Sequence, residues 1–315
     1  MLNFTTCCYS RSQVVEQAGL SSISVDAKST SSYFDRDAHD LDLPEELREI
    51  AYREFQETPE LRREKLLELR KMIMELPQEQ RILNLSDKNL VKYLRGKQYN
   101  LEKALQITIR SRKFETKYPE LIENSSGEEF LQFGNAFQIL KRRDKEGRVI
   151  GFIRPGVIAK IVCALKTPAI LPRLMCWIFR HLSEDPYVQV CGLVMINSFS
   201  NLSYIDGITV HTTVSMDQRI AALKYLQDCT AIRLKGVYVF DQPAFVAVVY
   251  NVIYYALSFK VRERVHICSQ NYGILAEKVH PDMTIFPRCV GGGQDDDGDG
   301  DNWIARQHAK EVATN

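Results

Sequence analysis

The sequence lacks the short motifs that mark nucleotide-binding loops, hydrolase nucleophiles and zinc proteases. It contains no GxxxxGK[ST] loop, no GxGxxG turn after a strand, no GxSxG elbow and no HExxH helix. The spacing of its six histidines is not that of metal ligands, and its eight cysteines form no CxxC pair, which is typical of reduced thiols in a cytosolic protein. We therefore expect no catalytic residues, no metal site, no cofactor and no enzyme activity.

An excess of charge of one sign is also missing. The 41 Lys and Arg are balanced by 40 Asp and Glu, so the formal net charge is +1 and a nucleic-acid partner is not expected. No apolar run approaches the ~20 residues of a membrane-spanning helix. The N-terminus also lacks the ~7 to 15 apolar residues of a signal peptide. We expect a monomeric, cytoplasmic protein.

Composition and hydrophobic periodicity divide the chain into four parts. Residues 1–42 are rich in Ser, Thr and Asp without any period, which predicts a disordered leader. Residues 43–120 have helical periodicity throughout, and residues 121–293 alternate between strand-like and helical patterns. Residues 294–315 begin with an acidic run and are expected to form an acidic loop and a polar tail.

The helical part predicts a hairpin of two helices followed by two capped helices. Pro44 and Pro59 stand where the hairpin helices begin. Ser86 then opens a short helix, and Asn100 caps another that runs to about Tyr118.

The alternating part predicts βαβ units and a mostly parallel sheet, hence an α/β fold. Four strands are expected, at residues 148–154, 188–196, 236–240 and 264–268, with helices at 170–183, 210–228 and 244–257.

The helix expected at 244–257 is apolar on two faces. One face carries Phe245, Val248, Val249, Val252 and Ile253, and tyrosines and other apolar residues occupy much of the opposite one. A surface helix is normally apolar on one side only, and 14 residues are too few to cross a bilayer. Two interpretations remain open. The segment is either a fully buried core helix or a lid between an apolar cavity and a membrane interface.

Positive charge gathers on both sides of this apolar segment. Lys260, Arg262 and Arg264 follow it, and Arg233 and Lys235 precede the strand before it. A third group, residues 88–117, carries nine Lys or Arg against two Glu. Clusters of this kind are either ordinary solvated surface or sites that anionic lipid surfaces attract.

Three segments, residues 90–104, 233–243 and 259–266, resemble signature motifs of the CRAL-TRIO lipid-binding family. They are similar, in order, to its N-terminal helical signature, to the strand that leads into its gate helix and to the basic turn that follows. The likeness spans about residues 43–293 and is greatest to the branch of tocopherol and retinaldehyde carriers and clavesins.

The resemblance implies a small all-α unit followed by a βαβ domain whose lipid cavity is closed by a gate helix. It also implies phosphoinositide binding at the positions that are all basic here: Lys97, Arg233, Lys235, Lys260 and Arg264. Side chains expected to line the cavity or gate are Val237, Val239, Phe245, Val248, Val249, Val252 and Ile253.

The function expected from these features is lipid transfer. The protein would bind a tocopherol, a retinoid or a phospholipid-like ligand and exchange it at phosphoinositide-containing membranes, with which it would associate peripherally and reversibly. The alternative is a phosphoinositide-binding adaptor in membrane or endosomal traffic without net lipid transfer. An enzyme acting on a lipid is a third hypothesis, for which the sequence nominates no residue.

Overall fold

The computed structural model describes residues 41–123, 125–167, 169–246, 254–295 and 302–314. The chain divides into two units, Met1–Asp40 and Leu41–Asn315, and all of the described residues belong to the second. The expected leader therefore lies outside the described residues except for its last two positions. The centre of the expected gate helix, residues 247–253, and most of the acidic run, residues 296–301, also lie outside them.

The first helices of the described chain form the predicted all-α unit. They are α2 (Glu45–Phe55), α3 (Pro59–Glu75), α4 (Asp87–Gly96) and α5 (Leu101–Lys117), with a 3-10 turn at Gln78–Gln80. Their apolar faces enclose a core of their own, which also receives Val190, Cys191 and Ala231 from the rest of the chain.

Side-chain caps start three of these helices where the sequence predicted. Thr58 accepts a hydrogen bond from the Leu61 N–H at 3.1 Å, and Ser86 accepts one from the Asn89 N–H at 3.3 Å. The Asn100 amide oxygen accepts one from the Lys103 N–H at 2.9 Å. Each cap satisfies a backbone donor that the first helical turn leaves free.

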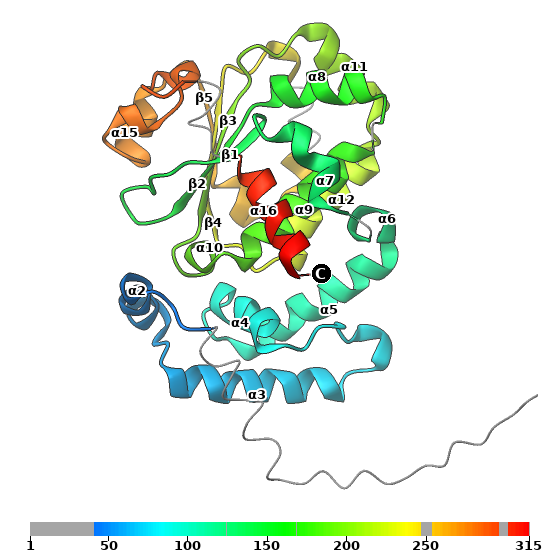
Figure 1. The fold of residues 1–315 in the computed structure, drawn as a ribbon, viewed down its shortest axis with the longest axis vertical. Coiled ribbons are helices and arrows are strands. Elements are labelled where there is room, and N and C mark those ends of the chain that lie inside the picture. The colour runs from blue at the N-terminus through cyan, green and yellow to red at the C-terminus, as the bar shows by residue number, and fades with distance from the viewer. Residues whose placement is uncertain (1–40, 124, 168, 247–253, 296–301, 315) are drawn as a thin grey trace, which may run out of the picture. The chain divides into compact units, whose positions relative to one another are not determined.

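The remaining chain forms the predicted α/β fold around a five-stranded sheet (Figure 1). The strands lie in the order β1 (Phe137–Ile139), β2 (Val149–Ile153), β3 (Leu193–Ser198), β4 (Leu234–Phe240) and β5 (Val265–Ser269). β1 pairs antiparallel with β2, and the other neighbours are parallel.

Helices cover both faces of this sheet. They are α6 (Pro119–Ile122), α7 (Gly127–Phe130), α8 (Pro155–Leu165), α9 (Ile170–Glu184), α10 (Pro186–Val190), α11 (Tyr204–Thr213), α12 (Met216–Lys224), α14 (Phe259–Arg262), α15 (Gly273–Lys278) and α16 (Trp303–Thr314). A π turn follows α12 at Tyr225–Cys229, and 3-10 turns lie at Leu131–Phe133, Met283–Ile285 and Arg288–Val290. Figure 1 shows α15 on one side of the sheet and α9 and α12 on the other.

The strand expected at residues 188–196 is wrong in its first half. Residues 186–190 form α10 instead, because Pro186 suits the first turn of a helix and the Asp185 carboxylate accepts hydrogen bonds from the N–H groups of Tyr187 and Val188. Gly192, with φ of 100°, then turns the chain into β3.

The single helix expected at residues 210–228 is also wrong, because it breaks into α11 and α12. Val214 is extended at the break and is buried in the core. The Arg219 guanidinium donates hydrogen bonds to the carbonyls of His211 and Val214, at 2.7 and 2.8 Å, which compensates for lost helical bonding.

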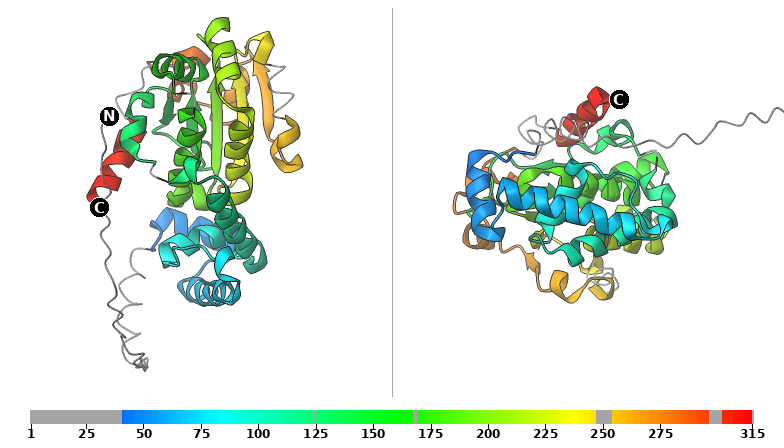
Figure 2. Two further views of the ribbon diagram at one scale, coloured as in Figure 1. Left: turned by 90° about the vertical axis from the view of Figure 1, so that its right-hand side faces the viewer. Right: turned by 90° about the horizontal axis from the view of Figure 1, so that it is seen from below.

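The chain expected to end in a polar tail carries helix α16. Trp303 and Ile304 are buried, and the Trp303 ring lies edge-on to Phe137, with centroids 5.1 Å apart. Burial of these two apolar side chains stabilises the helix, although most of the residues around them are polar. In Figure 2 the helix, in red, lies on the outside of the sheet domain, where it contacts α7 and β1.

A buried ion pair joins the loop after α2 to α4. Arg95 donates to both carboxylate oxygens of Glu57, at 2.7 and 3.0 Å, and both side chains are almost fully buried. Arg95 also donates to the Leu41 carbonyl and to the Gln189 side chain of α10, each at 3.1 Å. The pair therefore ties four separated segments together.

We expect Glu57→Gln to lower the free energy of unfolding by about 3 to 5 kcal/mol, because it leaves the buried Arg95 charge without its counterion. Urea unfolding followed by circular dichroism measures this change. Glu45→Gln is the matched control, since it removes a carboxylate from the exposed Arg48–Glu45 pair and should cost less than about 1 kcal/mol. Equal effects of the two substitutions would contradict this role of Arg95.

Candidate functional site

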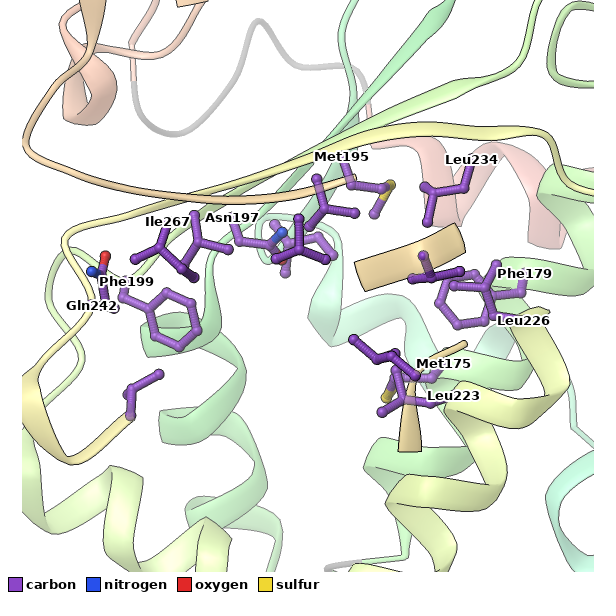
Figure 3. A pocket seen from close by; sticks show the side chains of 17 residues that line it. Met175, Phe179, Met195, Asn197, Phe199, Leu223, Leu226, Leu234, Gln242 and Ile267 are labelled. Atoms are coloured by element: carbon purple, nitrogen blue, oxygen red, sulfur yellow. The ribbon is translucent and has the colours of Figure 1, made fainter. Parts of the chain in front are cut away.

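An apolar cavity of about 320 Å³ lies between the sheet and helices α9 and α12 (Figure 3). Strands β2 to β5 form one wall, and Met175 and Phe179 of α9 with Leu223 of α12 form the opposite one. Sequence reasoning missed these three helical residues. Helices were expected at residues 170–183 and 210–228, but a helical pattern does not separate packed core from cavity wall.

Strand alternation decides which side chains reach the cavity. On β4, Val237 and Val239 line it, while Tyr238 and Phe240 point to the opposite face and pack in the core around α15. The neighbouring strands follow the same rule, so that Met195 and Asn197 of β3 and Val265 and Ile267 of β5 also line the cavity.

The predicted gate residues are only partly described. Val248, Val249, Val252 and Ile253 lie outside the described residues. Phe245 does not line the cavity; its ring packs against Gly207 and lies edge-on to Tyr204 of α11, with centroids 5.3 Å apart. The cavity is lined instead by Val246 and Leu257, on either side of the undescribed stretch.

Two amides are the only polar side chains among the described lining residues. The Gln242 amide nitrogen donates to the Ser269 hydroxyl at 3.1 Å, while its amide oxygen is buried and has no hydrogen-bond partner among the described residues. Asn197 lies farther along the same wall. A ligand with one hydroxyl group could satisfy the Gln242 oxygen, because that atom accepts hydrogen bonds.

A basic pocket, also of about 320 Å³, adjoins the cavity. Its walls include all five predicted phosphoinositide residues: Lys97, Arg233, Lys235, Lys260 and Arg264. The two hollows share the side chains of Leu226, Leu234 and Val261 as a common wall.

Gly96 allows the basic residues to converge from distant parts of the chain. A Cβ atom at this position would lie 2.2 Å from the Ala231 carbonyl oxygen, so only glycine lets the end of α4 approach the segment before β4. Lys97 follows Gly96 in the sequence. Lys235 of β4 and Lys260 of α14 line the same pocket.

The two arginines of the basic pocket are held by the protein itself. Arg233 donates to the Val190 carbonyl and pairs with Glu54 at 3.1 Å. Arg264 donates to the Leu234 carbonyl. These bonds fix both guanidinium groups before any ligand arrives.

The three lysines of the basic pocket are not paired in this way. Lys97, Lys235 and Lys260 have no ion pair with a described acidic residue. Burial, together with the charges of Lys260, Arg110 and Lys103, lowers the pKa of Lys97. Burial and the charge of Arg233 similarly lower the pKa of Lys235. An anion in this pocket would offset the effects of burial and of the neighbouring positive charges, since an opposite charge favours the ammonium form.

The described part of the chain shows neither a cluster of metal ligands nor a helix that could span a membrane. There, no group of three or more His, Cys, Asp or Glu side chains is arranged to hold a metal ion. None of the helices described is both long and apolar enough to cross a membrane.

Comparison with known proteins identifies the family to which the sequence belongs. Residues 134–292 match the model of the CRAL/TRIO domain. Clavesin-1 of Pongo abelii is 23% identical over 254 residues, which are 79% of this chain and 69% of that protein. Clavesin-2 of Homo sapiens is 33% identical over 109 residues, but these are 35% of this chain and only 32% of that protein.

Two further proteins are similar to this chain, one by its sequence and one by its structure. Alpha-tocopherol transfer protein-like of Pongo abelii is 25% identical over 258 residues, 79% of this chain and 71% of that protein. The crystal structure of Sfh5 is 12% identical with a TM-score of 0.47, over 81% of this chain and 98% of that one. Because the domain match covers half of the sequence, the chain belongs to the CRAL/TRIO family, whose members bind and transfer lipids.

Proposed function

We propose that this protein carries one hydrophobic lipid in the apolar cavity and exchanges it at membranes that contain phosphoinositides. The observation that supports this most directly is the common wall of the cavity and the basic pocket, formed by Leu226, Leu234 and Val261. Through this wall, an anionic headgroup in the basic pocket touches the same side chains that enclose the lipid.

The cavity is suited to a lipid in size and in composition. A volume of about 320 Å³ is at the lower end of the range for small-molecule sites, which are mostly apolar with a few polar groups. Burying ~300 Å² of apolar ligand surface at ~25 cal/mol per Å² contributes about 8 kcal/mol before ordering costs. Such a gain holds a water-insoluble ligand without a covalent bond.

Helix α14 contributes side chains to the outer surface of the protein, to the basic pocket and to the apolar cavity. Phe259 is 69% exposed, Lys260 lines the basic pocket, and Val261 lines both hollows. An exposed aromatic ring beside a lysine suits the interface of an anionic bilayer. We propose that headgroup binding at Lys260 displaces α14 and so opens the wall at Val261, a population shift driven by the membrane.

Other exposed apolar side chains extend this docking surface. Ile205 of α11 is 76% exposed, and Tyr255, shortly before α14, is 82% exposed. α11 contacts the start of the segment that leads to Tyr255, through Tyr204 and Phe245. We propose that these side chains enter the interfacial layer of the bilayer when the lipid is exchanged.

The cavity is tested by placing the same large side chain on the two faces of the sheet. We expect Val239→Trp to fill the cavity, so that lipid recovered by organic extraction and mass spectrometry falls at least about tenfold while thermal stability is largely kept. Val194→Trp is the matched control, because Val194 is buried in the packed core on the other face and overpacking there costs about 1 to 3 kcal/mol or more.

The outcome of this test separates a carrier from an adaptor. A wild-type protein with a stoichiometric lipid that exchanges with labelled vesicles is a carrier. A protein that retains its lipid without exchange, or holds none, would instead be an adaptor that reads phosphoinositides. Equal destabilisation by both tryptophans would mean that no usable space exists behind β4.

The basic pocket is tested with Lys97→Gln/Lys260→Gln, which removes two lysines and leaves the tethered arginines in place. We expect binding to phosphoinositide vesicles to weaken about thirtyfold, since each basic residue contributes ~1 kcal/mol. Vesicle co-sedimentation measures this loss, and lipid transfer should slow with it.

Affinity for the bound lipid in solution is the control readout and should stay within about twofold, because neither lysine lines the cavity. Thermal stability should be unchanged or higher, since the variant relieves repulsion between like charges. Parallel losses of lipid affinity and vesicle binding would show that the two lysines support the fold rather than docking.

A further inference from the structure

A third hollow, of about 560 Å³, lies where the helical unit meets the last helix of the chain. We call it the junction pocket. Its walls come from α4 and the loop before it, from Ser125 and Ser126, from the end of α9, and from α16. It shares no described lining residue with the apolar cavity or the basic pocket.

Lys92 is the buried charge of the junction pocket. Its side chain lines the pocket although the residue is only 8% exposed. No hydrogen bond or ion pair joins it to another described residue; the nearest recorded partner is the Tyr93 ring, 5.2 Å from Nζ to the centroid. Burial lowers the pKa of Lys92, and the charges of Glu184 and Glu115 oppose this shift only in part.

A second polar atom of the same walls, the Ser125 hydroxyl oxygen, is buried without a hydrogen bond to a described residue. The His308 Nδ1 atom is also buried there and lies 4.0 Å from the Glu311 carboxylate. Lys92 and Ser125 come from elements that are distant in sequence. Buried polar groups are almost always hydrogen-bonded, so two such groups around one hollow indicate a missing occupant.

The acidic residues of the junction pocket do not supply that occupant. Both carboxylate oxygens of Glu311 are already engaged: one accepts from Trp177 Nε1 and His181 Nε2, each at 2.8 Å, and the other accepts from the Gly127 N–H at 2.7 Å. Glu184 lies 3.8 Å from His181 Nδ1. Lys88 adds positive charge at the exposed rim.

We propose that the junction pocket binds a small water-soluble phosphomonoester, with its phosphate on Lys92 and the Ser125 hydroxyl. Phosphate oxygens accept from several directions at once, which matches donors that converge from separate elements. The remaining volume is lined by Asn84, Asn89 and Gln307, which can hydrogen-bond the polar remainder of such a ligand.

A ligand in this position would bind α4, α9 and α16 together. Because it binds only the folded chain, saturation should raise the unfolding temperature by about 5 °C at a concentration a hundred times its dissociation constant. The proposal does not depend on the cavity or on membrane docking.

The test uses the full chain with inorganic phosphate and glycerol 3-phosphate as probes, followed by calorimetric titration and thermal unfolding. We expect saturable binding that Lys92→Met weakens at least about tenfold and Ser125→Ala weakens about three- to tenfold. In Lys97→Gln/Lys260→Gln the binding that depends on Lys92 should persist, since this variant alters only the basic pocket.

Several results would overturn the proposal. They are no saturable binding at millimolar probe, wild-type affinity in both Lys92→Met and Ser125→Ala, or loss of binding in Lys97→Gln/Lys260→Gln, which would assign the phosphate to the basic pocket. If Lys92→Met does not fold, Ser125→Ala and Lys88→Gln decide in its place. Vesicles with and without phosphoinositide distinguish the source: if Lys92→Met weakens vesicle binding and leaves the soluble probes unaffected, the ligand is a lipid headgroup and the proposal fails.

Discussion

Strand alternation on β4 is the constraint from which the rest of the structure follows. It assigns Tyr238 and Phe240 to a packed core and Val237 and Val239 to an open space. That space is partly open to solvent, so its apolar walls remain in contact with water when it holds no ligand. Removing apolar surface from water is the dominant favourable contribution to folding and to association. An apolar ligand in the cavity would therefore bury its walls as side chains bury the opposite face of the sheet.

The basic pocket contains charged groups that the described residues leave without an opposite charge. Its arginines are satisfied by the protein, through Glu54 and the carbonyls of Val190 and Leu234, whereas burial and neighbouring cations lower the pKa of Lys97 and Lys235. Rigid arginines determine the shape of the pocket, and unpaired lysines leave a deficit that an anion can offset. Under the proposed function, the apolar cavity takes the lipid and the basic pocket takes an anionic headgroup, and an amphiphilic membrane would supply both.

The sequence predicted what is encoded locally. Caps such as Ser86 and Asn100 located the helices, and β4 with its alternating valines was assigned correctly. It did not predict features that depend on distant contacts. The break after α11 depends on the burial of Val214 and on hydrogen bonds from Arg219, and α16 depends on a site for Trp303 between distant aromatic rings. The cavity wall on α9 was missed for the same reason, since periodicity shows which face is buried and not whether the neighbouring space is filled.

Helix α4 connects these separate observations. Lys92 in its middle faces the junction pocket, Arg95 one turn later forms the buried pair with Glu57, and Lys97 after its end lines the basic pocket. Arg95 also donates to Gln189, so that one guanidinium fixes the helix against the sheet domain as well as within the helical unit. A flexible helix could turn its lysines toward solvent and remove the cost of burying them. Because Arg95 and Gly96 fix the position of α4, Lys92 and Lys97 cannot relax in this way, and both lysines remain in hollows where a bound anion would offset the cost of their burial.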